Sequence, residues 1–174
     1  MYQVDEKDKV IELKNVPQSS VGAPMPIVLS DERKIFLAYL LQDEPNWNNP
    51  TSVDFERSGE SIAIVEFNLR RSFMFGSLNE EAFSGHPLFE RGLRPYGVFE
   101  VENSSWIRKL ERMNSVHEYH KPKHFEKYKH FVFAFHDSTF ECVAESFKFS
   151  IHEGSLESAL TEMQKKLFSR INFE

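Results

Sequence analysis

Residues 129–150, KHFVFAFHDSTFECVAESFKFS, alternate between aromatic or apolar side chains and other residues on both sides of a short polar break. Period-two alternation in a stretch this rich in phenylalanine predicts two antiparallel strands joined by a tight turn. We place the turn at Asp137 and Ser138, which makes Phe133 and Cys142 direct cross-strand partners. This hairpin is the strongest constraint on the fold.

The two faces of the predicted hairpin differ in chemistry. One face is apolar and is expected to be core: Phe131, Phe133, Phe135, Phe140, Cys142 and Ala144. The other mixes imidazoles, carboxylates and small apolar groups: His130, Val132, Ala134, His136, Thr139, Glu141, Val143 and Glu145. We expect this second face to be a polar surface that borders a ligand pocket; in the alternative, another layer covers it and its polar groups satisfy one another. Phe147 and Phe149 have the parity of the polar face, which predicts a bulge or a change of neighbours near Glu145.

Several other segments are expected to be strands, namely residues 9–13, 26–30, 61–68, 71–76 and 96–102. Residues 34–42 are compatible with a helix or a strand, and we favour a hairpin with residues 26–30 that turns at Asp31 and Glu32, because their apolar side chains do not form a single stripe. Residues 43–60 are predicted to be an exposed loop, in which Trp47 acts as a lid or covers a core edge. Residues 77–96 form either a functional loop or a packed excursion.

Two helices are predicted. Asn103 or Ser104 caps the first, which runs to about residue 115. Ser155 caps the second, and its apolar stripe is Leu156, Ala159, Leu160, Met163, Leu167 and Ile171. The expected class is α+β: an antiparallel, hairpin-rich sheet, with a two-layer sandwich or roll as one form, one internal helix and one C-terminal amphipathic helix.

Composition restricts the classes of function. The 174 residues are expected to form one globular domain, 1–174. A net charge of -6, with no stripe of lysine and arginine, argues against nucleic-acid binding. One cysteine, no apolar signal region and no long apolar run predict a cytoplasmic protein without membrane contact. No cofactor is predicted.

The recognisable catalytic and phosphate-binding motifs are missing from the sequence, so histidines and their polar neighbours are the candidates. The candidate catalytic residues are His86, His136 and Glu141. The candidate ligand-binding residues are His86, Arg91, His117, His136 and Glu141. His117 and His120 are weak candidates for a metal site, and the alternative is a solvated helix end. Cys142 is expected to be a buried, inert thiol.

Three segments resemble a family of small bacterial proteins: SGHPLFERGLRPYG at residues 84–97, FEVENSSWIRKLERMNSVHEYH at 99–120 and HFVFAFHDSTFECVAE at 130–145. SDERKIFLAYLLQ at residues 30–42 is a weaker match. The resemblance implies a bacterial, cytoplasmic, single-domain protein, and it implies no activity, cofactor or site residue.

Three functions are therefore open. The first is a non-catalytic or regulatory domain that binds a small molecule or another protein. The second is a small hydrolase or isomerase that uses a His/Glu pocket. The third is a protein that binds a transition metal through histidine.

Overall fold

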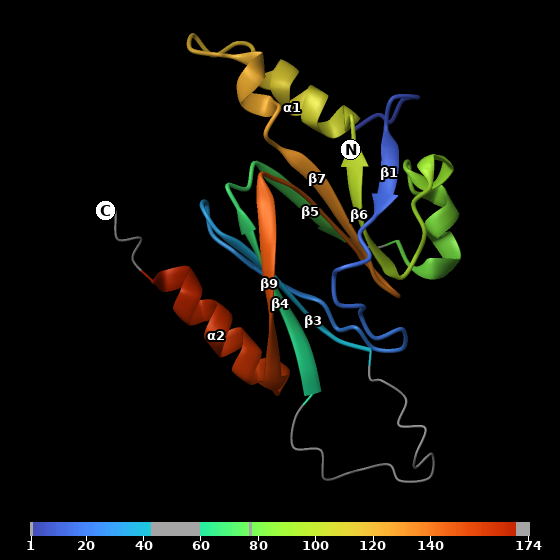
Figure 1. Ribbon diagram of the computed structural model, residues 1–174, viewed down its shortest axis with the longest axis vertical. Coiled ribbons are helices and arrows are strands. Elements are labelled where there is room, and N and C mark those ends of the chain that lie inside the picture. The colour runs from blue at the N-terminus through green and yellow to red at the C-terminus, as the bar shows by residue number, and fades with distance from the viewer. Residues whose placement is uncertain (1, 43–59, 77, 170–174) are drawn as a thin grey trace.

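The computed structural model describes residues 2–42, 60–76 and 78–169. Two antiparallel sheets pack against each other, and helices cover their outer faces (Figure 1). The first sheet has the order β1-β6-β7-β8-β5, with β1 (Lys9–Glu12), β5 (Ser72–Gly76), β6 (Gly97–Glu102), β7 (Lys129–Ala134) and β8 (Thr139–Ala144). The second has the order β2-β3-β4-β9, with β2 (Ile27–Ser30), β3 (Ile35–Leu40), β4 (Glu60–Asn68) and β9 (Ser146–Gly154). The predicted α+β class with antiparallel sheets is confirmed.

Large apolar side chains from both sheets fill the space between them. The apolar face of β7 and β8 lies here as predicted, opposite Ile35, Leu37, Tyr39, Ala63, Val65 and Phe67 of the second sheet. The ring of Phe67 lies 5.3 Å from that of Phe140 and 5.8 Å from that of Phe133. Aromatic pairs at such distances contribute about 0.5–1.5 kcal/mol beyond area burial. Alternation in the sequence therefore identified the side chains of β7 and β8 that form the core between the two sheets.

The turn between β7 and β8 lies one residue earlier than predicted. Phe133 pairs with Phe140 and not with Cys142, because the chain reverses at His136 and Asp137. Moving a turn by one residue shifts the pairing by two, so every side chain keeps its face. The predicted partnership of Phe133 and Cys142 is wrong, while the burial of both on one face is confirmed.

Residues 34–42 contain a strand, which confirms the preferred interpretation over a helix. β2 and β3 pair with Ser30 opposite Ile35, and the chain reverses at Glu32 and Arg33, one residue later than predicted. The Oδ1 atom of Asp31 accepts hydrogen bonds from the backbone N–H groups of two residues in the turn, at 2.7 and 2.6 Å. An aspartate that binds the backbone two and three residues ahead stabilises such a turn.

One bent ribbon joins the two sheets. β4 pairs with β9 and β5 with β8, while residues 69–71 join β4 to β5 and Glu145 alone joins β8 to β9. Three residues on one strand thus face a single residue on the other, which is the arrangement of a β-bulge. Within it, Leu69 has a left-handed backbone conformation with φ of 48°. The predicted change of neighbours near Glu145 is confirmed, since Phe147 and Phe149 belong to a strand of the other sheet.

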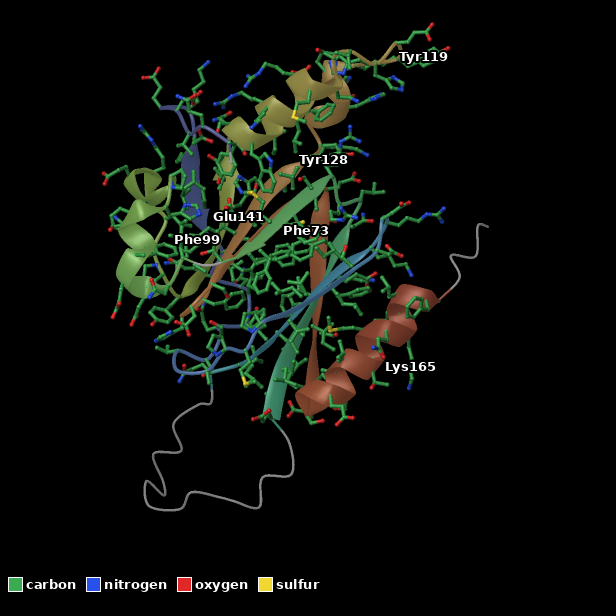
Figure 2. The ribbon with its side chains drawn as sticks, turned by 180° about the vertical axis from the view of Figure 1, so that it is seen from behind. Phe73, Phe99, Tyr119, Tyr128, Glu141 and Lys165 are labelled. Carbon is green, nitrogen blue, oxygen red and sulfur yellow. The ribbon has the colours of Figure 1, made fainter. Side chains whose placement is uncertain are left out.

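The helices are α1 (Ser105–Asn114), α2 (Leu156–Phe168) and the short 3-10 helices η1 (Glu80–Gly85), η2 (Phe89–Arg91) and η3 (Pro122–Phe125). Ser104 and Ser155 cap α1 and α2 as predicted, each accepting a backbone N–H with its hydroxyl. α2 covers the four-stranded sheet through Ala159, Met163 and Leu167, and Lys165 is exposed (Figure 2). Trp47 and Ile171 lie outside the described residues.

The outer face of the five-stranded sheet is not the polar surface that was expected. It is covered by apolar side chains: Tyr2, Phe83, Leu88, Leu93 and Trp106. The described part of the segment 77–96 therefore packs on the sheet, as one of the two predicted alternatives has it. His130, Val132, Ala134, Thr139, Glu141 and Val143 of this face are consequently all buried. The alternative interpretation, in which another layer covers these side chains, is the one observed.

Candidate functional site

Glu141 is the centre of the buried polar groups beneath this covering layer (Figure 2). It lies on β8, on the face that points away from the inter-sheet core, because its neighbours Phe140 and Cys142 point into that core. Three side chains reach its carboxylate: Tyr2, His86 and His130. They come from distant parts of the chain, so the cluster depends on the complete fold.

His130 connects Glu141 to the start of α1. Its Nε2 lies 2.9 Å from Glu141 Oε2, and its Nδ1 lies 2.9 Å from Ser104 Oγ. A carboxylate only accepts hydrogen bonds, so Nε2 carries a proton and donates it. Ser104 Oγ accepts from the N–H of Ile107 and is also hydrogen-bonded to Nδ1. His130 therefore links the buried carboxylate to the Ser104 cap through both of its ring nitrogens.

His86 approaches the other carboxylate oxygen. Its Nδ1 accepts a hydrogen bond from the backbone N–H of Leu88 at 3.1 Å, which leaves the proton on Nε2. That Nε2 lies 3.4 Å from Glu141 Oε1. The ring stacks on Phe83 with centroids 5.8 Å apart. The segment between η1 and η2 thus holds His86 in one tautomer and one orientation.

Tyr2 closes the cluster from the N-terminal segment. Its hydroxyl donates to Glu141 Oε2 at 2.5 Å, and its ring stacks on Trp106 with centroids 5.4 Å apart. Burial, followed by the charge of Glu141, raises the pKa of the Tyr2 hydroxyl far above its ordinary value. Tyr2 is therefore a permanent hydrogen-bond donor.

The charge on Glu141 is the result of two opposed effects. Burial raises the pKa of the carboxyl group, but hydrogen bonds from His130 and His86 and the charge effect of His130 outweigh it, with a further contribution from Tyr2. The net result lowers the pKa to about 2 from an ordinary 4.5. Glu141 is therefore an anion throughout the neutral range.

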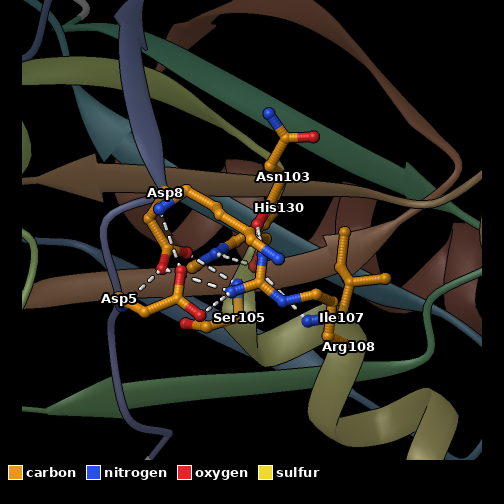
Figure 3. Close-up of polar contacts among 9 residues, drawn as sticks. Asp5, Asp8, Asn103, Ser105, Ile107, Arg108 and His130 are labelled. Carbon is orange, nitrogen blue, oxygen red and sulfur yellow. Dashed lines mark hydrogen bonds and ion pairs between the residues drawn. The ribbon is translucent and has the colours of Figure 1, made fainter.

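A second polar group fixes the N-terminal segment against α1 (Figure 3). The buried carboxylate of Asp8 accepts a hydrogen bond from the backbone N–H of Ser105 at 2.6 Å, and the guanidinium of Arg108 lies 2.5 Å from Asp5 and 3.8 Å from Asp8. A carboxylate at a helix N-terminus is stabilised by the unpaired N–H groups and the helix dipole. Residues 2–8 are thus attached to α1 through Asp5 and Asp8 and to β8 through Tyr2. We call these residues, α1 and residues 80–93 the α1 layer.

Ser104, His130 and Glu141 form the linear order of a Ser-His-acid triad, in which an acid orients an imidazole beside a hydroxyl. Their surroundings do not suit a nucleophile. All three are buried, and the Ser104 oxygen is used as a helix cap. With every donor and acceptor matched inside the protein, the cluster is organised as a structural support.

The other candidate residues do not join Glu141. His136 lies in the turn, where its Nδ1 is 2.9 Å from Asp137 Oδ1 and its Nε2 is 3.6 Å from Glu80 Oε1. The interaction with Asp137 raises the pKa of His136. Arg91 is exposed in η2.

His117 and His120 lie beyond the end of α1. His117 is exposed and accepts the N–H of Tyr119, while Nε2 of His120 lies 2.7 Å from Glu111 Oε1. Within residues 2–42, 60–76 and 78–169, no group of three or more His, Cys, Asp or Glu side chains is arranged to hold a metal ion. Cys142 is a buried free thiol as predicted, and burial raises its pKa.

Two grooves flank α1. The first, which we call the α1 groove, has a volume of about 750 Å³ and is lined by Gln3, Val4, Asp5, Ser105, Lys109, Arg112 and Met113. The second has a volume of about 860 Å³ and lies between α1, η3 and β6, with Ile107, Phe125 and Tyr128 among its lining residues. Both volumes are in the range of small-molecule sites.

The molecule was also compared with known proteins. No model of a protein family, no curated protein and no solved structure matches the chain. Among the described residues, no helix has the length and apolar character needed to cross a membrane.

Sequence reasoning missed several members of the cluster. His130 was placed on the same face as Glu141 but was not selected as a site residue, and that shared parity was the available signal. Ser104 was identified only as a cap. Tyr2 and Asp8 gave no local signal, because their positions depend on contacts with residues 139 and 97 positions away.

Proposed function

We propose that the protein is a non-catalytic binding domain whose ligand is a small organic anion, held in the α1 groove. The cluster around Glu141 supports this role by fixing both walls of the groove. Tyr2 and Asp8 hold the N-terminal wall, and Ser104 holds the first turn of α1. Binding groups that are positioned by a second layer of interactions lose little entropy when a ligand arrives.

The hydroxyl of Ser105 is the observation that carries the proposal. The residue is only 5% exposed, and its Oγ has no hydrogen-bond partner among the described residues. A buried polar atom without a partner costs about 1–3 kcal/mol, so such atoms usually mark a water or ligand position. Ser105 lines the α1 groove, so we place the missing partner of this oxygen, a ligand group or a water, on the groove side of the residue.

The charge of the groove indicates the chemistry of the ligand. Lys109 and Arg112 follow Ser105 at helical spacings of four and seven residues, which places all three on one face of α1. Asp5 also lines the groove, and Arg108, which it shares with Asp8, partly offsets its charge. Val4 and Met113 add an apolar part to the lining. A carboxylate or phosphate monoester with an apolar portion matches this combination.

Binding assays with named probes test the proposal. Octanoate and phenyl phosphate should raise the melting temperature of the wild type, since a ligand that binds only the folded state stabilises it by mass action. Ser105→Ala and Arg112→Ala should each remove most of that increase. Arg91→Ala removes an exposed arginine that does not line the groove and is the matched control.

The decisive result is the difference between the arginine variants. Equal responses of Arg112→Ala and Arg91→Ala would mean that the anions bind nonspecifically. No response of the wild type to either probe, measured by calorimetry as well as by melting, would remove the α1 groove as an anion site.

A hydrolase is the second candidate, and the order Ser104, His130, Glu141 favours it. It requires residues 2–8 to leave the cluster so that Ser104 becomes accessible. Hydrolysis of p-nitrophenyl acetate by the wild type, lost in Ser104→Ala but retained in Ser155→Ala, would replace the binding proposal with this one. We also propose a cytoplasmic location, which the single, buried, free cysteine supports. A bacterial origin is proposed on the resemblance of residues 84–97, 99–120 and 130–145 alone.

A further inference from the structure

The edges of the two sheets differ in length. β1 and β5 are the edges of the five-stranded sheet, with 4 and 5 residues, and β2 is a 4-residue edge of the other sheet. β9, the remaining edge, has 9 residues. No strand within the described residues pairs with its outer side. Proteins usually protect edges by keeping them short or by placing proline or a bulge in them, and the interior of β9 has neither.

Apolar side chains are exposed along β9. Phe149 is 42% exposed and Ile151 is 46% exposed. Both point to the inner side of the sheet, because they pair with Val65 and Ala63 of the inter-sheet core. Beside them lies a hollow of about 650 Å³ whose apolar lining includes Leu13, Val16, Phe147 and Phe149. The edge therefore offers backbone hydrogen-bonding groups and an apolar surface together.

The charged and polar side chains of β9 already interact with other parts of the chain. Lys148 Nζ lies 3.1 Å from Glu66 Oε2, and both carboxylate oxygens of Glu153 accept from the hydroxyl of Ser61, at 3.1 and 3.0 Å. His152 is turned toward α2, where it contacts Glu162 and Ser158. A partner strand thus meets no uncompensated charge near the centre of β9.

We infer that a second copy of this chain pairs with β9, antiparallel, about a two-fold axis that passes through Phe149. An antiparallel pair places opposite residues on the same face, so the odd-numbered residues of one copy must meet odd-numbered residues of the other. The axis at Phe149 sets Phe149 against its own copy and Phe147 against Ile151. Lys148 then faces Ser150, and no like charges oppose each other within the paired region.

An alternative register brings less compatible side chains opposite each other. An axis through Ser150 sets Phe147 against Glu153 and Lys148 against His152, which places an apolar ring beside a carboxylate and two basic groups beside each other. An axis through Phe149 brings the exposed apolar residues into one continuous row over the hollow beside Leu13 and Val16. The four-stranded sheet would then continue through both copies, an isologous arrangement in which each copy contributes the same surface.

The size of the contact sets the expected strength. Nine residues at about 3.3 Å each give an edge roughly 30 Å long, and one row of side chains along it buries less than the roughly 1,600 Å² of a standard interface. The dimer is therefore weak and in exchange with the monomer. The fraction of dimer rises with protein concentration, and the measured average mass rises with it toward twice the 20.4 kDa of one chain.

Sedimentation of the full chain over a range of concentrations tests the pairing. Phe149→Lys should shift the protein to monomer at every concentration. Phe75→Lys is the matched control, because Phe75 is 44% exposed on the edge strand β5 of the other sheet. Circular dichroism would verify that both variants are folded. A wild type that is monomeric throughout, or a dimer that Phe149→Lys leaves unchanged, overturns the inference.

Disulfide trapping tests the register. In Phe149→Cys, the two new cysteines face each other across the axis at a Cα separation within the 4.4–6.8 Å that a disulfide allows. Oxidised glutathione should therefore link the two copies. In Ile151→Cys, the new cysteines are separated by roughly 13 Å along the strands and should stay unlinked. Cys142 is buried and does not compete. Linking of Ile151→Cys in preference to Phe149→Cys would reject the axis at Phe149.

Discussion

Both outer faces of the sandwich hold a histidine beside a glutamate, but the two pairs are in different surroundings. His130 and Glu141 lie under the α1 layer, where the side chain of Glu141 is 6% exposed. His152 and Glu162 lie at the margin of α2, where the side chain of Glu162 is 36% exposed. Water competes with the second pair and is excluded from the first. The same two residue types therefore contribute very differently to stability.

The two covering layers also use different forces. α2 attaches through a stripe of Ala159, Met163 and Leu167, and apolar contact of this kind has little directional requirement. The α1 layer packs through an apolar cluster that includes Phe83, Leu93 and Trp106, and it adds hydrogen bonds with fixed geometry, which link residues 2–8 to β8 and to the first turn of α1. The α1 layer should consequently depend on pH, and the α2 layer should not.

Replacing the central carboxylate should give the largest effect. Glu141→Gln removes the charge that orients three donors and presents an amide to one of them, and removing one partner of a buried charged group costs about 3–5 kcal/mol. Urea denaturation at pH 7 measures this loss. The pKa of Glu141 is depressed in the folded state, so its contribution is present above the ordinary pKa of 4.5 and is lost as the pH falls toward about 2. The difference between wild type and variant should decrease over that interval.

Glu162→Gln is the control for that measurement. Glu162 also interacts with a histidine, at 3.0 Å, and with Lys166 at 2.6 Å, but it is open to water. Exposed pairs contribute at most about 1 kcal/mol, so this variant should remain close to wild type. A loss as large as that of Glu141→Gln would mean that burial does not distinguish the two pairs.

A cavity in the α2 layer should have the next largest effect. Met163 is fully buried between α2 and the four-stranded sheet, and Met163→Ala should cost about 2–4 kcal/mol. Denaturation at pH 7 and pH 4 should give the same value, because the stripe itself is apolar and the substitution leaves the contact between His152 and Glu162 in place. A clear pH dependence would show that α2 relies on the Glu162 pair more than its exposure suggests.

The hydroxyl of Tyr2 connects the N-terminal segment to the cluster. Tyr2→Phe keeps the stacking on Trp106 and removes the hydrogen bond to Glu141, a bond to a charged acceptor worth about 1.5–3 kcal/mol. Hydrogen exchange at the N–H of Ser105 should accelerate, since Asp8 in the same segment protects it. Unchanged exchange would indicate that Asp8 holds residues 2–8 without help from Tyr2.

The features of the two covered faces that could be predicted from the sequence are those that depend on local periodicity. Alternation placed Phe133 and Glu141 on opposite faces, and that assignment holds although the turn lies one residue earlier than predicted. Helical spacing likewise identified Ala159, Met163 and Leu167 of the α2 stripe, with Leu156 packed against them, whereas Leu160 is not part of that cluster. The covering of Glu141 was not predicted as the preferred outcome, because Tyr2 and His86 reach it from 139 and 55 positions away and no local pattern encodes such contacts.

Two serine caps provide the finest comparison between the layers. Ser155 and Ser104 each cap a helix with the hydroxyl, and an Ala substitution at such a position costs about 0.5–2 kcal/mol. Ser155→Ala should fall near the lower end, since that hydroxyl is exposed. Ser104→Ala should fall near the upper end, because the hydroxyl is buried and its loss also leaves Nδ1 of His130 without its hydrogen-bond partner. Thermal denaturation of both variants at one pH measures the difference, and equal losses would mean that the bond between Ser104 and His130 adds nothing to the cap.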